Sequence, residues 1–301
     1  MRAFAKATTA SLRVRIITAK HLDQVFSKHP EWSAGTRNNR LGHYKQFFKW
    51  CRARGYMHRD SDPAFGWDNL KVPNRDRFRV PINEWNNLLD SAETPTQRIV
   101  LATGLFLFLR GSEQQFLKLE HVNLDTGEIE VFRVKTQTWD TMPISTELDH
   151  YLRQHLIWLA KNGVSKPEHY LIPSMTAPLQ RDKGKFIAGT GTINPDQPFY
   201  RPYDVVKAVL ANAGYATRGE GEHTLRRSGA RAYFDQLVDQ GYDGALRRVM
   251  SMLGHKKSET TERYLGLDLE RRARNRAIKG QPMFPSLTRQ DAQIIPIRKG
   301  L

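Results

Sequence analysis

The chain has 301 residues, and its 47 Lys and Arg against 31 Asp and Glu give a formal net charge of +16 at pH 7. This length allows two domains whose cores need no disulfide or metal support. The charge excess favours a polyanion or an anionic membrane as partner; the alternative is a basic surface that only keeps the chain soluble. The longest apolar run, 99–109, is far shorter than the ~20 residues of a membrane-spanning helix, and the lone Cys51 excludes an internal disulfide. We therefore expect a soluble, cytoplasmic protein.

Residues 1–73 are expected to form a small helical domain. Apolar residues recur at three- and four-residue spacing over 12–26 and more regularly over 33–54, and Gly55 is placed to end the second helix. The apolar stripe of that helix consists of Leu41, Tyr44, Phe47, Phe48 and Cys51. The cations on its other faces, which are candidate contacts to DNA phosphates, are Arg37, Arg40, Lys45, Lys49 and Arg52. The alternative is an ordinary solvated amphipathic helix.

A linker is expected at 74–81, because the prolines at 73 and 81 resist helix formation and the charges between them favour solvent. The second domain, 82–301, begins with a helix from Asn83 through Asp90 and a nearly all-apolar helix over 96–109. Arg110 follows this helix directly, so a buried scaffold would fix its backbone while its guanidinium reaches the surface. Glu113 could hold that guanidinium. The alternatives are a structural salt bridge for Arg110 and a simple helix N-terminal acid for Glu113.

A hairpin is expected next, because 128–134 and 139–144 alternate as strands and Lys135 stands in the turn between them. A lysine at such a turn is, taken alone, usually only solvated. A helix is predicted over 146–161. The Gly-, Pro-, Thr- and Lys-rich stretch 174–200 is expected to be the least ordered part of the chain, and a surface loop over DNA or another subunit is one interpretation that the sequence leaves open. Further helices are predicted over 203–213, 223–240, 246–253 and 270–278.

The stretch from His223 to Tyr264 carries residue types suited to phosphodiester chemistry. It contains the runs His223-Thr224-Leu225-Arg226 and Leu253-Gly254-His255, and then Tyr264. A guanidinium matches two phosphate oxygens at once, an imidazole can donate to phosphate or move a proton near neutral pH, and a phenol can act as nucleophile. Alone, the tyrosine would be a packing residue and the Leu-Gly-His a helix end. The histidines lack metal-ligand spacing, so no metal is expected.

The order and spacing of these residues resemble the tyrosine recombinase (phage-type integrase) family. The family's first arginine box is matched by Arg110-Gly111-Ser112-Glu113, and Lys135 stands where the family keeps its catalytic lysine. The matches run in the family's order from about Thr103 to Tyr264. The resemblance implies a mainly α fold with a small β-sheet. In that fold an N-terminal helical core-binding domain and an α+β catalytic domain form a clamp around DNA.

The resemblance also implies a mechanism without metal, ATP or other cofactor. Tyr264 would attack a DNA phosphate and form a 3′-phosphotyrosyl link. The roles implied for the other residues are phosphate binding by Arg110, Arg226 and His255, protonation of the leaving oxygen by Lys135, proton removal or phosphate support by His223, and support of Arg110 by Glu113. We therefore expect a site-specific recombinase or integrase. The alternatives are a type IB topoisomerase-like nicking enzyme and a DNA-binding regulator with an inactive site.

The partners implied are double-stranded DNA with specific recombination sites and a homotetramer on DNA that associates weakly without it. The tail 281–301 ends in the apolar peptide Ile294-Ile295-Pro296-Ile297, which could be exchanged between subunits by docking on a neighbour, a disordered end being the alternative. No membrane partner is expected. A bacterial or phage-encoded, nucleoid-associated protein fits this set of partners.

Overall fold

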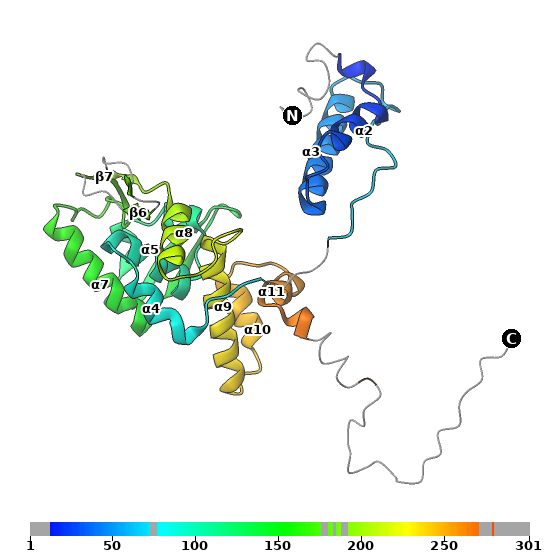
Figure 1. Cartoon of the computed structure of the whole chain (residues 1–301). Coiled ribbons are helices and arrows are strands. Elements are labelled where there is room, and N and C mark those ends of the chain that lie inside the picture. Colours follow the sequence, from blue (N-terminus) through cyan, green and yellow to red (C-terminus); the bar gives the residue numbers. More distant parts are fainter. Residues whose placement is uncertain are drawn as a thin grey trace, which may run out of the picture. The chain divides into compact units, whose positions relative to one another are not determined.

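The computed structural model describes residues 13–72, 77–175, 180–182, 185–187, 192–270 and 279. The chain divides into two compact units, Met1–Arg75 and Asp76–Leu301 (Figure 1). Helices dominate both units, and the described strands form only small sheets. The predicted fold class, mainly α with a small β-sheet, is confirmed. No helix within the described ranges is long and apolar enough to cross a membrane.

The first unit contains a 3-10 turn over Val14–Ile16 and two helices, α2 (Ala19–Ser27) and α3 (Ala34–Ala53). The prediction over 33–54 is confirmed: the hydroxyl of Ser33 accepts the backbone N–H of Thr36 at 3.2 Å, and Gly55 follows the helix with φ of 72°. Such a left-handed residue ends a helix at little cost when it is glycine. The predicted stripe is buried at Leu41, Tyr44, Phe48 and Cys51, and Phe47 packs against it.

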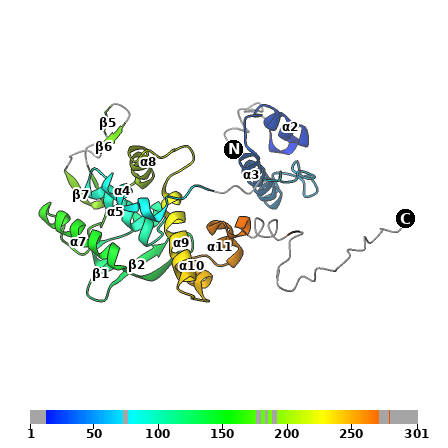
Figure 2. The same ribbon diagram turned by 60° about the horizontal axis from the view of Figure 1, so that its bottom comes forward.

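The helices of the second unit follow the predicted periodicities closely. They are α4 (Trp85–Asp90), α5 (Pro95–Phe106), α6 (Gly111–Gln114), α7 (Thr146–Lys161), α8 (Pro202–Asn212), α9 (Glu222–Asp239), α10 (Ala245–Met252) and α11 (Ser258–Leu265). Short 3-10 turns lie at Ile82–Glu84 and Leu119–His121. Helix α5 is the centre of the core, packed against α7, α8 and α9. Helices α9, α10 and α11 lie side by side at one end of the unit (Figure 2).

Helix α5 ends at Phe106, three residues before the predicted end at Leu109. The cause is Phe108, which has φ of 52° and so cannot continue a right-handed helix. Leu109 remains buried, and Arg110 leaves the core as the residue that precedes α6. Arg110 therefore projects from a rigid buried segment, as the sequence suggested.

Strands β1 (Val122–Asn123), β2 (Glu128–Arg133) and β3 (Thr138–Pro143) form an antiparallel sheet in which Phe132 pairs with Trp139. The stretch 174–200, which the sequence left open, contributes strands. Strand β4 (Pro173–Met175) pairs with β7 (Ile193–Pro198), and β5 (Gln180–Asp182) pairs with β6 (Lys185–Ile187). The pairing of β4 with β7 joins segments that are distant in sequence, and local periodicity does not report such a pairing.

The segment 77–81, expected to be part of a solvated linker, belongs to the second unit. Val80 is 2% exposed, and its backbone N–H donates to the hydroxyl of Ser228 at 2.8 Å. The guanidinium of Arg79 donates to the carbonyl of Leu265 at 3.0 Å. A buried backbone N–H needs such an acceptor, so this stretch is fixed on α9 and α11. Residues 73–76, the helix predicted over 271–278 and the tail 281–301 lie outside the described residues.

Candidate active site

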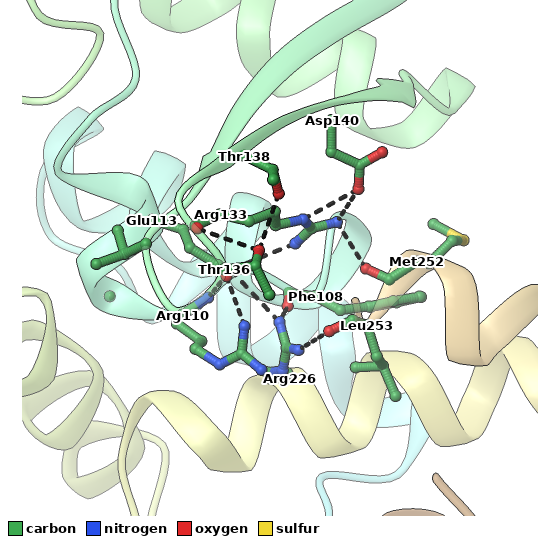
Figure 3. A network of polar contacts seen from close by, with 12 residues as sticks. Phe108, Arg110, Glu113, Arg133, Thr136, Thr138, Asp140, Arg226, Met252 and Leu253 are labelled. Carbon is green, nitrogen blue, oxygen red and sulfur yellow. Dashed lines mark hydrogen bonds and ion pairs between the residues drawn. The ribbon is translucent and has the colours of Figure 1, made fainter. Parts of the chain in front are cut away.

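The carboxylate of Glu113 is the buried anion around which three arginines gather (Figure 3). Its Oε1 lies 2.6 Å from Nη1 of Arg110, and its Oε2 accepts the backbone N–H of Arg110 at 2.9 Å. The same Oε2 lies 3.4 Å from Nη1 of Arg133 and 3.5 Å from Nη1 of Arg226. One buried carboxylate thus compensates three guanidiniums that would otherwise repel one another. The net positive charge left over suits a phosphate.

Arg226 is held within this cluster by two backbone carbonyls. It is 1% exposed, and its guanidinium donates to the carbonyl of Phe108 and, at 2.5 Å, to that of Leu253. Phe108 has the left-handed backbone noted above, which is uncommon for a bulky residue and found most often at functional sites. Burial lowers the pKa of Arg226 to about 10, so the side chain remains charged at pH 7.

The phenol of Tyr264 lies in the pocket of its own chain. Its hydroxyl donates to the backbone carbonyl of His223 at 3.4 Å, and its ring meets the ring of His255 edge-on with centroids 5.6 Å apart. Burial raises the pKa of Tyr264, and the charges of Arg226, Arg227 and Arg110 oppose that rise. The nucleophile predicted from sequence therefore lies beside the backbone of His223 and the ring of His255, within the field of the arginines.

The side chains of His223 and His255 are both neutral at pH 7, because their pKa values are lowered. Burial, followed by the charges of Arg226 and Arg110, lowers the pKa of His223 and lowers that of His255 to about 4. The Nδ1 of His255 lies 3.1 Å from the hydroxyl of the fully buried Thr261. This contact orients the imidazole ring, and the sequence did not suggest Thr261 as its partner.

Lys135 is exposed in the turn at 134–137 that joins β2 to β3, as predicted. Its charge contributes to the lowered pKa of His255, which places the lysine at the rim of the same cluster. The structure therefore brings together Arg110, Glu113, Lys135, His223, Arg226, His255 and Tyr264.

Sequence reasoning missed Arg133, which is 4% exposed and joins the cluster from β2. Its Nε and Nη2 lie 3.0 and 2.8 Å from Oδ2 of Asp140 on β3, and Nη2 also donates to the carbonyl of Met252 at 2.8 Å (Figure 3). The alternation of β2 offered a signal, because Arg133 follows Ile129 and Val131 on the inward face. A charged residue at an inward strand position predicts a buried ion pair.

Four of the five candidate DNA contacts in the first unit have partners within that unit. The guanidinium of Arg37 lies over the rings of Phe26 and Trp67, Arg40 over Trp32, Lys45 donates to the carbonyl of Trp67, and Arg52 pairs with Asp62. Lys49 is exposed on α3. Each of these four contacts is made by the charged group of the side chain. Within the described residues, no three His, Cys, Asp or Glu side chains gather as metal ligands.

The chain matches the sequence model of the Phage integrase family over residues 79–271. It is 25% identical to tyrosine recombinase XerC of Salmonella typhi over 236 residues, which are 77% of this chain and 69% of that protein. Its fold is similar to that of a lambda integrase dimer bound to a COC′ core site, with a TM-score of 0.63 at 16% identity over 88% of this chain and 68% of the other. It is also similar to XerH recombinase bound to difH substrate, with a TM-score of 0.60 at 18% identity over 92% and 76%.

The family match spans the whole cluster, from the segment before α4 to the end of α11, and therefore includes both arginine boxes, the hairpin lysine and the tyrosine. The likeness to the solved structures independently supports the fold. The chain belongs to the phage integrase family, and the expectation of a tyrosine recombinase is confirmed.

Proposed function

We propose that this recombinase cleaves and rejoins DNA at specific sites through a 3′-phosphotyrosyl intermediate on Tyr264. The observation that carries the proposal is the position of the phenol, beside His223 and His255 and in the field of Arg226 and Arg110. The phenol oxygen forms a bond to phosphorus, and the bond from phosphorus to the 5′-oxygen breaks. The phenol proton passes to the neutral His223 ring, and Lys135 protonates the departing 5′-oxygen.

The arginines and His255 supply electrostatic stabilisation of the phosphorane-like transition state. Arg110 is partly exposed and fixed by Glu113, and Arg226 is fixed by two carbonyls, so their free N–H groups are already oriented before DNA binds. Removal of one such oriented donor commonly costs ~10²–10³ in rate. The phosphodiester energy is kept in the tyrosyl link, so rejoining to another strand needs no ATP and no metal step.

The partners we propose are two duplexes and three further copies of the chain. One of the similar structures is a lambda integrase tetramer bound to a Holliday junction. The first unit would close the clamp on the duplex through the basic face of α3, with Arg37, Arg40, Lys45, Lys49 and Arg52 as contacts.

A tail exchanged between subunits would find an apolar pocket of about 400 Å³ on the second unit, lined in part by Ile82, Trp85, Phe106, Tyr233 and Met252. The residues of the tail at 294–297 are apolar, as are the named residues that line the pocket.

Covalent capture from a random library tests the proposed activity and identifies the recognised sequence in the same experiment. Duplexes with a randomised core and a nick are incubated with the protein, so that the cleaved fragment diffuses away and the adduct persists. After denaturing washes, the retained DNA is sequenced. A single enriched sequence that is lost in Tyr264→Phe is the expected result.

Three other outcomes would contradict the proposal. Capture by Tyr264→Phe would place the nucleophile elsewhere. Sequence-specific binding without any adduct would indicate a regulator with an inactive site. Relaxation of a supercoiled plasmid that lacks the enriched sequence would indicate a topoisomerase-like enzyme.

A further inference from the structure

The Arg133 side chain connects three segments that carry the proposed catalytic groups. It lies on β2, two residues before Lys135, and reaches Glu113 of the first arginine box. Its contact with the carbonyl of Met252 ties it to the end of α10, where Leu253-Gly254-His255 begins. Figure 3 shows the contacts of the guanidinium with Asp140 and with the Met252 carbonyl. A planar fork with five donors is the side chain best suited to bridge acceptors on different segments.

The glycine of the Leu-Gly-His segment lies directly against this guanidinium. Gly254 has φ of 62°, and a Cβ built on it would be 3.8 Å from Nε of Arg133. The turn that presents His255 is therefore packed on Arg133 as well as hydrogen-bonded to it through Met252. A movement of Arg133 would shift both the hairpin and this turn.

All three nitrogens of the Arg133 guanidinium are bonded to protein acceptors. Its Nε and Nη2 bond to Asp140 and its Nη1 to Glu113, which indicates a structural role for this side chain. Among the described residues, the hydrogen bonds of the hairpin turn at 134–137 connect residues inside the hairpin, such as Thr136 with Thr138. The guanidinium of Arg133 links the base of this turn to Glu113 and to the Met252 carbonyl.

We propose that Arg133 is a positioning residue that holds the β2–β3 hairpin in the register at which Lys135 reaches the leaving 5′-oxygen. The inference rests on the proposed role of Lys135 as general acid. A displacement of a proton donor by about 1 Å can lower a rate by ~10²-fold. Arg133 therefore acts through Lys135, and its loss should resemble the loss of that lysine rather than the loss of a phosphate-binding group.

A substrate with sulfur in place of the bridging 5′-oxygen separates these roles. A thiol has a far lower pKa than an alcohol, so a 5′-thiolate departs without a proton donor. The duplex recovered by covalent capture is made in both forms, and adduct formation is timed for the wild type, Arg133→Met, Asp140→Asn and Lys135→Ala. Glu130→Gln, which removes an exposed acid from the outer face of β2, is the matched control.

We expect Arg133→Met and Lys135→Ala to be slowed by ~10²-fold on the oxygen substrate and to regain nearly the wild-type rate on the sulfur substrate. Asp140→Asn keeps the contacts of Arg133 with Glu113 and Met252 and should show a smaller loss with the same recovery. DNA affinity and the midpoint of thermal unfolding of Asp140→Asn should stay near those of the wild type, since Asp140 is partly exposed.

Two results would overturn the proposal. If Arg133→Met and Asp140→Asn remain slow on the sulfur substrate while Lys135→Ala recovers, Arg133 supports the phosphate side or only the fold. If both variants cleave the oxygen substrate at the wild-type rate, the hairpin needs no anchor. Failure of the proposed function is distinct, because the wild type would then form no adduct with either substrate.

Discussion

Gly229 lies where α9 packs tightly on the end of α5, and its replacement by alanine should damage both stability and the site. A Cβ at this position would lie 1.9 Å from the backbone carbonyl oxygen of Leu105 and 2.7 Å from the ring of Phe108. Real Cβ atoms essentially never come within 3.0 Å of such neighbours, so the two helices must separate by about 1 Å. Forced overpacking of this kind costs about 1–3 kcal/mol, or more when backbone must move.

The higher helix propensity of alanine opposes this overpacking cost, but its contribution to the free energy of unfolding is smaller. Alanine is better than glycine in a helix interior by about 1 kcal/mol. Gly104→Ala provides a matched control in the same pair of helices, because the three nearest atoms to its Cβ would belong to side chains and none would come within 3.0 Å: Cδ1 and Cβ of Leu225 at 3.1 and 3.2 Å, and Nε2 of Gln114 at 3.7 Å. We therefore expect Gly229→Ala to lower the midpoint of thermal unfolding by about 4–8 °C relative to Gly104→Ala.

The same substitution should slow cleavage. Phe108 presents the carbonyl that binds Arg226, so displacement of Phe108 moves an acceptor of the buried guanidinium. Adduct formation on the captured duplex should fall by ~10²-fold, whereas Gly104→Ala should stay near the wild-type rate. A Gly229→Ala protein as stable and as active as Gly104→Ala would refute the packing argument and its link to Arg226.

Three further predictions concern buried titratable groups. Glu113→Gln should lower the free energy of unfolding by about 3–5 kcal/mol in denaturant titrations, because three guanidiniums lose their buried counter-charge, whereas Glu130→Gln should change it little. Burial lowers the pKa of His155, whose Nε2 donates to the carbonyl of Leu171, to about 4 in the folded state. The unfolded chain then binds the extra proton first, so up to about 3 kcal/mol of stability present above pH 6.5 should be lost as the pH falls toward 4. His155→Gln should reduce the pH dependence of the unfolding free energy by that amount, and the lowered pKa values of His255 and His223 should account for a remainder. Burial also lowers the pKa of His223, so at subsaturating DNA the rate of adduct formation should be flat from pH 8 to 7 and fall only below 6.5. A profile that falls below pH 6.5 just as steeply in His223→Gln would show that another group takes the proton.

Local sequence patterns predicted most of the helical fold. The helices expected over 33–54, 146–161 and 203–213 follow from side-chain preferences within a few residues, and the structure confirms those helices. The N-cap of α7 is Ser145, the residue before the predicted start of the helix at 146, and its hydroxyl accepts the backbone N–H of Leu148. The order of the arginine, histidine and tyrosine motifs also indicated the family, because chemistry fixes their types and spacing even where the surrounding sequence differs.

The partners of these residues were decided only by tertiary structure. Arg133 and Glu113 are 20 positions apart, and Arg226 reaches the carbonyl of Phe108 across 118 positions. The left-handed backbone of Phe108 and the pairing of β4 with β7 likewise depend on contacts distant in sequence. Periodicity and spacing describe one segment at a time, whereas a buried charge is stabilised by whichever segments the completed fold brings against it. The sequence by itself therefore determined which side chains could act on a phosphate, and the packing of α5, α9 and the hairpin determined how they are held.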